Sequence, residues 1–337
     1  MTPSHIDPHA TSIDSAVLDR LLRADDALTL EHLGESLGLT ATAVRAALDA
    51  LAGAGCQIEI GPRDVRLVQT GLSVWSDYVQ WATGPDRIVD VYRQTGSTQD
   101  LVRRIVEDRT AAADGALVVA DHQTAGRGRL GRRWLAPPGT AVTFSLAWMG
   151  PGTEARSRLD HLLFATSVAV AEAIEALCGP QRPAVQIRWP NDVLLNGRKA
   201  AGILVETFTP ARRPETTAAV IGVGINVSLR NDQIPDELRA EGRGMSSLAM
   251  CGSAPDRLRV LAEVVARIDR GLEEPDTAAL LARWRQRSVL LSQRVSLRHN
   301  GRVVHVRVVD LDPHEGLIVQ TDEGVIVHVP GQTASIV

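Results

Sequence analysis

The chain has 337 residues and a formal net charge of −4. This length exceeds one ordinary domain and suits two or three, and the small net charge does not by itself indicate a nucleic-acid partner. No apolar run is long enough to span a bilayer, and residues 1–15 lack the basic start and apolar core of a secretory signal. We therefore expect a cytoplasmic protein without a membrane partner.

The three cysteines, Cys56, Cys178 and Cys251, lie far apart in the sequence. An odd number at these distances forms neither a metal-ligand spacing nor a disulfide framework. We therefore expect reduced thiols and no metal ion held by the protein itself.

The first segment, residues 1–70, has the pattern of a winged helix-turn-helix. A short helix is expected to end at Gly38, because glycine adopts the left-handed backbone of a helix end without strain. Thr40 is placed to cap the next helix, which extends to about Ala52. Two short strands, Gln57–Ile60 and Val65–Val68, follow as the wing.

The second segment, residues 85–287, alternates apolar strands with helical stretches. We therefore expect a central α/β domain with a mixed sheet flanked by helices. The expected strands are Ala116–Ala120, Ala141–Trp148, Val185–Trp189, Val193–Leu195, Ala200–Glu206 and Ala218–Val223. The expected helices are Thr98–Glu107, Arg158–Leu177, Asp256–Leu272 and Thr277–Arg287.

The third segment, residues 288–337, carries strand patterns throughout and predicts a small SH3-like β barrel. The three segments together predict a multidomain α+β protein. The expected strands of the barrel are Arg294–Arg298, Val303–Val309, Leu317–Gln320 and Val325–Val329.

Lysine usage singles out one residue. Of the 36 basic residues, Lys199 is the single lysine and all others are arginine. A lysine that persists against this bias is one for which arginine cannot substitute, because lysine is a compact point charge whereas arginine is a planar fork. The alternative is the chance survival of a surface lysine.

The segment Gly126–Trp134 is the densest indication of a ligand. It holds three glycines and four arginines between Gly126 and Arg133, with no acidic residue among them. Glycines let backbone N–H groups approach an anion, and arginines bind phosphate or carboxylate. The segment lacks the Gly-Lys-Ser/Thr ending of a Walker A loop. Its place between two expected strands favours a ligand loop over a solvated basic loop.

Lys199 follows a hairpin turn at Asn196–Gly197 and begins the returning strand. Its partners at alternate positions are Ala201, Ile203 and Val205, so we expect Lys199 to share their core-facing side. A buried ammonium is costly unless it meets an anion, which favours a ligand carboxylate or phosphate next to Lys199. The alternative is a strand-end lysine whose amine reaches solvent.

Two other segments carry weaker indications. Gly222–Asn226 places small residues at a strand end, where either a ligand or tight packing would need them. Gly96–Asp100 precedes an expected helix, which Ser97 or Thr98 can cap. The first N–H groups of that helix would also favour an anion, although capping is the simpler interpretation.

Several of these segments together resemble the biotin protein ligases. Gly126–Trp134, Trp189–Asp192, Arg198–Glu206 and Gly222–Asn226 are similar, in order and spacing, to signature segments of that family. The resemblance implies that biotin and ATP, with Mg²⁺, form biotinyl-5′-AMP. Biotin is then expected to pass to a lysine of a biotin carboxyl carrier protein. Members of this family often form homodimers, so the resemblance leaves open a homodimer of this chain.

The resemblance also implies roles for matching positions, with Arg129 and Lys199 as the catalytic cations. The positions implied for biotin binding are Ser97, Thr98, Gln99, Gln123, Arg127, Gly128, Arg129 and Lys199. The positions implied for nucleotide binding are Gly126, Arg132, Trp134, Asn191, Asp192 and Asn226.

Gly34–Gly38 and the wing resemble the branch of the family that is both ligase and repressor, but the charge of the first segment departs from a DNA-binding pattern. Residues 1–70 hold five arginines against ten acids, a net charge of −5, whereas phosphate contacts dominate DNA affinity. Two alternatives therefore remain for the first segment: it binds DNA, or it is a degenerate module retained for packing or for shaping ligand access. The candidate DNA contacts are Thr42, Arg45, Arg63 and Arg66.

Two alternatives to the ligase remain at the level of sequence. The first is a lipoate or octanoyl transferase of the same fold, against which the arginine-rich segment argues. The second is a biotin-sensing, DNA-binding regulator without catalysis, against which the complete active-site motifs argue.

Overall fold

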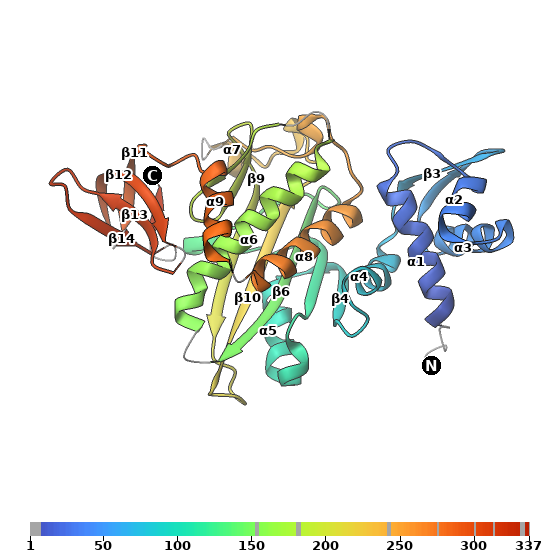
Figure 1. Ribbon diagram of the computed structural model, residues 1–337, viewed down its shortest axis with the longest axis horizontal. Helices are drawn as coiled ribbons and strands as arrows, with labels where there is room; N and C mark the ends of the chain where they lie inside the picture. The colour runs from blue at the N-terminus through green and yellow to red at the C-terminus, as the bar shows by residue number, and fades with distance from the viewer. Residues whose placement is uncertain are drawn as a thin grey trace.

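The computed structural model describes residues 8–151, 155–179, 183–240, 244–274, 276–299, 301–312, 314–330 and 334–336. These residues form three units in a row, with the N-terminal and C-terminal units at opposite ends of a larger central unit (Figure 1). The first seven residues of the expected N-terminal segment lie outside the described part. No helix in the described ranges has the length and apolarity needed to cross a membrane.

The N-terminal unit packs three helices on a three-stranded antiparallel sheet of order β1-β3-β2. Its helix ends are confirmed as expected. Gly38 has a left-handed backbone (φ 65°) after α2, and the Thr40 side chain accepts from Ala43 N at the start of α3. The elements are α1 (Pro8–Arg23), β1 (Leu28–Thr29), α2 (Leu30–Leu37), α3 (Ala41–Gly53), β2 (Gln57–Ile60) and β3 (Asp64–Gln69).

A helix that the sequence analysis left unassigned joins this unit to the central one. After η1 (Leu72–Val74), α4 (Trp75–Thr83) buries Trp75, Tyr78 and Val79. Their spacing of three and four residues is the helical signal that was available in the sequence. Because these side chains belong to the same continuous core as α1 and the central sheet, the N-terminal unit is packed against the rest of the chain.

The central unit is built on a seven-stranded sheet of order β4-β5-β6-β10-β9-β8-β7, in which the β4–β5 pair alone is parallel. The sheet is therefore mixed, as expected. Its strands are β4 (Val89–Thr95), β5 (Leu117–Gln123), β6 (Ala141–Pro151), β7 (Val185–Arg188), β8 (Asp192–Leu195), β9 (Arg198–Phe208) and β10 (Thr216–Asn226).

The two faces of this sheet are covered unequally. Helices α6 (Ala155–Leu177) and α8 (Arg257–Glu273) cross one face (Figure 1), where Ile203 and Val223 are buried. On the other face, α5 (Thr98–Arg109) packs Val102 and Val106 against Phe208 at one end. The remaining helices of the unit are η2 (Thr110–Ala113), η3 (Arg129–Gly131), η5 (Asn231–Gln233), α7 (Asp236–Ala240), η6 (Ala249–Cys251) and α9 (Thr277–Arg287).

The C-terminal unit is a five-stranded antiparallel sheet of order β14-β13-β12-β11-β15. The four expected strands are confirmed, while the short β15 was not expected. A register shift between Val308 and Asp310 bends the long strand β12. The strands are β11 (Arg294–His299), β12 (Arg302–Asp312), β13 (Gly316–Gln320), β14 (Ile326–Val329) and β15 (Ala334–Ile336).

Candidate active site

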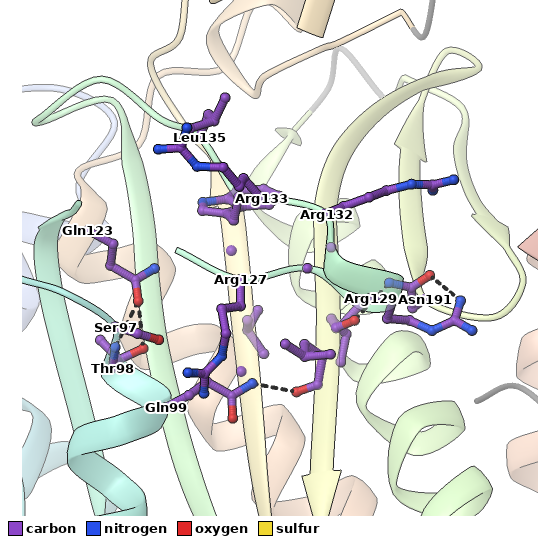
Figure 2. Close-up of a pocket in the computed structure, with 18 of the residues that line it drawn as sticks. Ser97, Thr98, Gln99, Gln123, Arg127, Arg129, Arg132, Arg133, Leu135 and Asn191 are labelled. Carbon is purple, nitrogen blue, oxygen red and sulfur yellow. Dashed lines mark hydrogen bonds between the residues drawn. The ribbon is translucent and has the colours of Figure 1, made fainter. Parts of the chain in front are cut away.

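A pocket opens on the part of the central sheet that α5 leaves uncovered. It is lined from the β4–α5 junction, the loop after β5, strands β9 and β10, and the segment after β10 (Figure 2). The structure brings to its wall twelve of the fourteen residues for which the resemblance implied a biotin or nucleotide role: Ser97, Thr98, Gln99, Gln123, Arg127, Gly128, Arg129, Arg132, Trp134, Asn191, Asp192 and Lys199.

Gly126 and Asn226 are the two named site residues that do not line the pocket. Gly126 O accepts from Trp134 N at 3.0 Å, and a Cβ on Gly126 would lie 2.6 Å from Trp134 O. Glycine is therefore required there to close the loop. Asn226 is fully buried behind the wall and donates from Nδ2 to Ser246 O at 3.0 Å, which holds the segment after β10 in place.

One end of the pocket presents buried polar atoms. Thr98 N and Oγ1 donate to Gln123 Oε1 at 2.8 and 3.1 Å. Ser97 Oγ and Gln99 Oε1 are buried and have no hydrogen-bond partner among the described residues. Since buried polar atoms without partners are costly, this end is suited to a small ligand that supplies hydrogen bonds (Figure 2).

Ser145 was not singled out from the sequence, although it and Thr143 are hydroxyl residues in a mostly apolar strand. Its Oγ lies 2.7 Å from Thr98 Oγ1 inside the pocket wall. Leu238 and Met245 also line the pocket. They carry no sequence signal, because the path of the chain after β10 brings them there.

The segment Gly126–Trp134, which we call the flap, forms a closed loop over the pocket. Gly128 N donates to Arg132 O at 2.7 Å. Arg127 forms ion pairs with Asp100 at 2.6 Å and Glu206 at 3.0 Å. The flap therefore bridges α5 and β9 through one guanidinium.

Arg129 lies on the other side of the flap and contacts two further elements. Its guanidinium donates to Asn191 Oδ1 at 3.3 Å (Figure 2). It also donates to Ala334 O of the C-terminal unit at 2.8 Å. The flap is thus in contact with both the turn between β7 and β8 at Asn191 and strand β15.

Lys199 is paired with a carboxylate of the protein. Its Nζ lies 2.6 Å from Asp192 Oδ1, and Arg188 Nη2 lies 2.8 Å from Asp192 Oδ2. Burial disfavours the charged form of Asp192, but Lys199 and Arg188 outweigh it and hold the pKa of this carboxyl below its usual value. The three side chains carry one net positive charge at the pocket wall.

The prediction that Lys199 faces the same side of the strand as Ala201, Ile203 and Val205 is wrong. A register shift between Val193 and Leu194 makes Ala200 an additional residue in β9, so Leu194 pairs with Lys199 and Val193 with Ala201. A bulge reverses the alternation of side chains. The Lys199 amine therefore lies on the same side as Gly202, whose Cβ would be 3.1 Å from Nζ.

Glycines in β9 and β10 make room for the larger side chains. A Cβ on Gly202 would lie 3.3 Å from the Trp134 ring, and one on Gly222 would lie 2.7 Å from Gln99 Nε2. Gly224 also faces Trp134. Gly222 and Gly224 thus leave room for the side chains of Gln99 and Trp134 to pack closely against β10. Of the two alternatives that the sequence left open, this contact is the tight packing.

This arrangement suits chemistry at an anionic centre. Four flap arginines and Lys199 line the pocket, and none of its described lining residues is a cysteine or a histidine. The hydroxyls of Ser97 and Ser145 have no histidine beside them in this wall to act as a base. The site can therefore bind and stabilise negative charge without a covalent nucleophile.

Comparison with known proteins identifies the family to which the chain is related. Residues 91–226 match the model of the biotin/lipoate A/B protein ligase family. The chain is also similar, at 27% identity over 302 residues, to the bifunctional ligase/repressor BirA of Bacillus subtilis, with 88% of this chain and 90% of that protein covered.

Two further relatives narrow the class. The biotin–(acetyl-CoA carboxylase) ligase of Mycobacterium tuberculosis is 33% identical over 218 residues, which cover 64% of this chain and 76% of that protein. A structure of the biotin protein ligase from Aquifex aeolicus with biotin and ATP has a TM-score of 0.59 and 27% identity, over 74% of this chain and 98% of that one. The chain belongs to the biotin protein ligase family.

Proposed function

We propose that the chain activates biotin with ATP to biotinyl-5′-AMP and transfers biotin to a lysine of an acceptor protein. The observation that carries this proposal is the single pocket in which the arginine-rich flap and Lys199 meet buried polar atoms with no protein partner. A ligand with an anionic centre and a polar ring at the other end fits such a pocket.

The first step takes place at the cationic side. A carboxylate oxygen of biotin attacks the α-phosphorus of ATP, the bond to the bridging oxygen breaks, and pyrophosphate leaves. Negative charge gathers on the oxygens around phosphorus, so positioning and electrostatic stabilisation carry most of the catalysis. Arg129 and Lys199 are the catalytic cations in this proposal, with Arg132, Trp134, Asn191 and Asp192 on the nucleotide side. Gly126 and Asn226 act from outside the pocket by holding the flap and the segment after β10.

Biotin is proposed to extend from these cations towards the buried polar end. Its ureido ring has two N–H donors and one carbonyl acceptor, and Gln99 Oε1 and Ser97 Oγ are the unpaired groups there. Thr98, Gln123, Arg127 and Gly128 complete the biotin-binding set. In the second step, the acceptor amine attacks the carbonyl carbon of the mixed anhydride, and AMP leaves.

Magnesium is proposed to arrive with the phosphates of ATP. Asp192 is the one carboxylate among the described lining residues, and its two oxygens are bound to Lys199 and Arg188. These residues do not form a site for the ion in this arrangement. We therefore assign it no protein ligand and no step.

Pyrophosphate release tests the function. With ATP and Mg²⁺, we expect release to depend on biotin and to be at least about 100-fold faster than with lipoate, because a site built for N–H groups rejects a ligand that lacks them. Arg129→Ala is expected to lose most of the rate. Equal rates with biotin and lipoate, or an unchanged rate in Arg129→Ala, would contradict the proposal.

The acceptor and the finer architecture are part of the same proposal. Relatives named as acetyl-CoA carboxylase ligases support a biotin carboxyl carrier protein as acceptor. We propose a winged helix-turn-helix in residues 1–70, a catalytic domain in residues 85–287 and an SH3-like domain in residues 288–337. Sedimentation with and without biotinyl-5′-AMP tests whether the protein is a homodimer.

We expect the N-terminal unit not to bind DNA. The candidate contacts Thr42, Arg45, Arg63 and Arg66 are all exposed, but Arg45 is the one arginine on α3, and the segment has a net charge of −5. An electrophoretic mobility shift at micromolar protein and about 150 mM salt should show no retarded band, with or without biotin and ATP. A sequence-dependent band would instead support a repressor.

A further inference from the structure

The chain leaves the N-terminal unit at Thr70, where it is fixed to the residue that precedes α8. Thr70 N and Oγ1 donate to the two carboxylate oxygens of Asp256, each at 2.9 Å, and Trp75 Nε1 donates to Thr70 Oγ1 at 3.0 Å. Asp256 also caps α8 by accepting from Leu258 N at 2.7 Å. Thr70 and Trp75 are buried, so water does not compete for these bonds.

The next residue, Arg257, reaches from this junction to the sheet that carries the active site. Its guanidinium forms an ion pair with Asp121 of β5, donates to Ala141 O of β6 at 3.4 Å, and lies 5.3 Å from the centroid of the Trp75 ring. The side chains of Arg257 and Asp121 are 13% and 15% exposed. One largely buried guanidinium therefore contacts the linker helix and two strands.

The contact between Arg257 and Asp121 lies at the end of β5 that is no longer paired with β6. Strands β5 and β6 pair only as far as Ala120 and Thr143, whereas β5 continues to Gln123, which pairs with Thr95 of β4 on its other side. Beyond Ala120, where β5 and β6 no longer pair, Arg257 contacts the Asp121 side chain of β5 and Ala141 O of β6 and so connects the two strands. The end of β5 carries Gln123, which accepts from Thr98 in the pocket.

We propose that Arg257 is a positioning residue for biotin binding. Arg257 couples the docking of the N-terminal unit, at Thr70 and Trp75, to the end of β5 that carries Gln123. This inference rests on the proposed function, since it concerns the biotin end of the pocket. Arg257 does not line the pocket, so its effect on biotin is indirect, through the strands that it contacts. Figure 1 shows α4 between the N-terminal unit and the sheet, where this coupling lies.

The test is to compare Arg257→Gln with the unchanged protein for biotin and for ATP separately. We expect the KM and Kd for biotin to rise about tenfold, as loss of a buried charged hydrogen bond would give. The kcat of pyrophosphate release and the KM for ATP should change less than about twofold. Arg257→Lys should recover part of the biotin affinity, and Asp121→Asn should reproduce the effect without altering the arginine.

Coupling to the N-terminal unit is tested by Thr70→Val, which removes the hydroxyl bond to Asp256. The same change removes the acceptor of Trp75 Nε1. We expect the biotin KM to rise about threefold, and the Thr70→Val/Arg257→Gln pair to match Arg257→Gln alone. Arg259→Gln is the matched control. Arg259 lies on the same helix and also faces the N-terminal unit, at 4.0 Å from Asp25, but it has no contact with β5 among the described interactions.

Hydrogen exchange gives a readout that does not depend on ligase activity. Arg257→Gln, but not Arg259→Gln, should raise amide exchange in residues 121–128. Unchanged exchange there, additive effects of the two substitutions, or an equal loss of kcat and of affinity for both substrates would overturn the inference. Failure of the unchanged protein to release pyrophosphate with biotin would instead remove the proposed function, while the exchange result still decides the support of β5.

Discussion

Replacing Lys199 by alanine is expected to lower the rate of biotin-dependent pyrophosphate release by about 100- to 1000-fold, the usual cost of removing one preorganised charge-stabilising donor. The Lys199 amine lies at the pocket wall with its pair Asp192. Its loss removes charge from the place where negative charge develops and leaves Asp192 facing the anionic reactants. Single-turnover measurement with saturating biotin and ATP would report this directly.

Two further variants control this experiment. Lys199→Arg keeps the charge but replaces a point charge by a planar fork, and Gly202 and Trp134 leave little room for it. We therefore expect it to stay well below the unchanged protein. Arg104→Ala removes one exposed positive charge from α5 outside the pocket and should change the rate less than about twofold. A Lys199→Ala enzyme at full rate would remove Lys199 from the mechanism.

Replacing Asp192 by asparagine is expected to lower the stability of the protein. The Asp192 side chain is buried between Lys199 and Arg188, which would then face each other without the carboxylate. Breaking a largely buried ion pair leaves uncompensated charge, so we expect the free energy of unfolding at pH 7 to fall by about 2 kcal/mol. Urea unfolding of both proteins would measure the difference.

The pH dependence of that difference identifies its cause. The folded-state pKa of Asp192 is lowered, so its contribution to stability is fully present above the unfolded-state pKa of about 3.9 and is lost as the pH falls through the lower folded-state value. The gap between the unchanged protein and Asp192→Asn should therefore be constant from about pH 5 to 7 and shrink below about pH 4. A gap that persists at low pH would point to packing instead of charge.

Local structure followed closely from local residues. The helix α9 (Thr277–Arg287) has the bounds expected from the sequence, and the caps at Gly38 and Thr40 lie where they were placed. These features depend on hydrogen bonds and backbone angles within a few residues. They are therefore readable without knowledge of the remaining chain.

Elements that depend on distant partners were missed or misread. Strand β4 lies at the edge of the sheet and is mostly polar beyond Val91, so its sequence lacks the apolar run by which the other strands were recognised. The orientation of Lys199 was wrong because the bulge at Ala200 arises from pairing between β8 and β9. Alternation in a single strand cannot report an additional residue that only the ladder reveals.

The sequence by itself determined which residue types gather at the site: the glycine-arginine flap, the single lysine, and the segments that carry the family resemblance. Only the tertiary structure decided that Asp192 pairs with both Lys199 and Arg188, that Ser97 Oγ and Gln99 Oε1 have no hydrogen-bond partner among the described residues, and that Arg257 contacts β5. The reason is that composition and spacing are properties of one stretch of chain. Pairing and burial are set by residues that folding brings together from more than a hundred positions apart, as with Asp121 and Arg257.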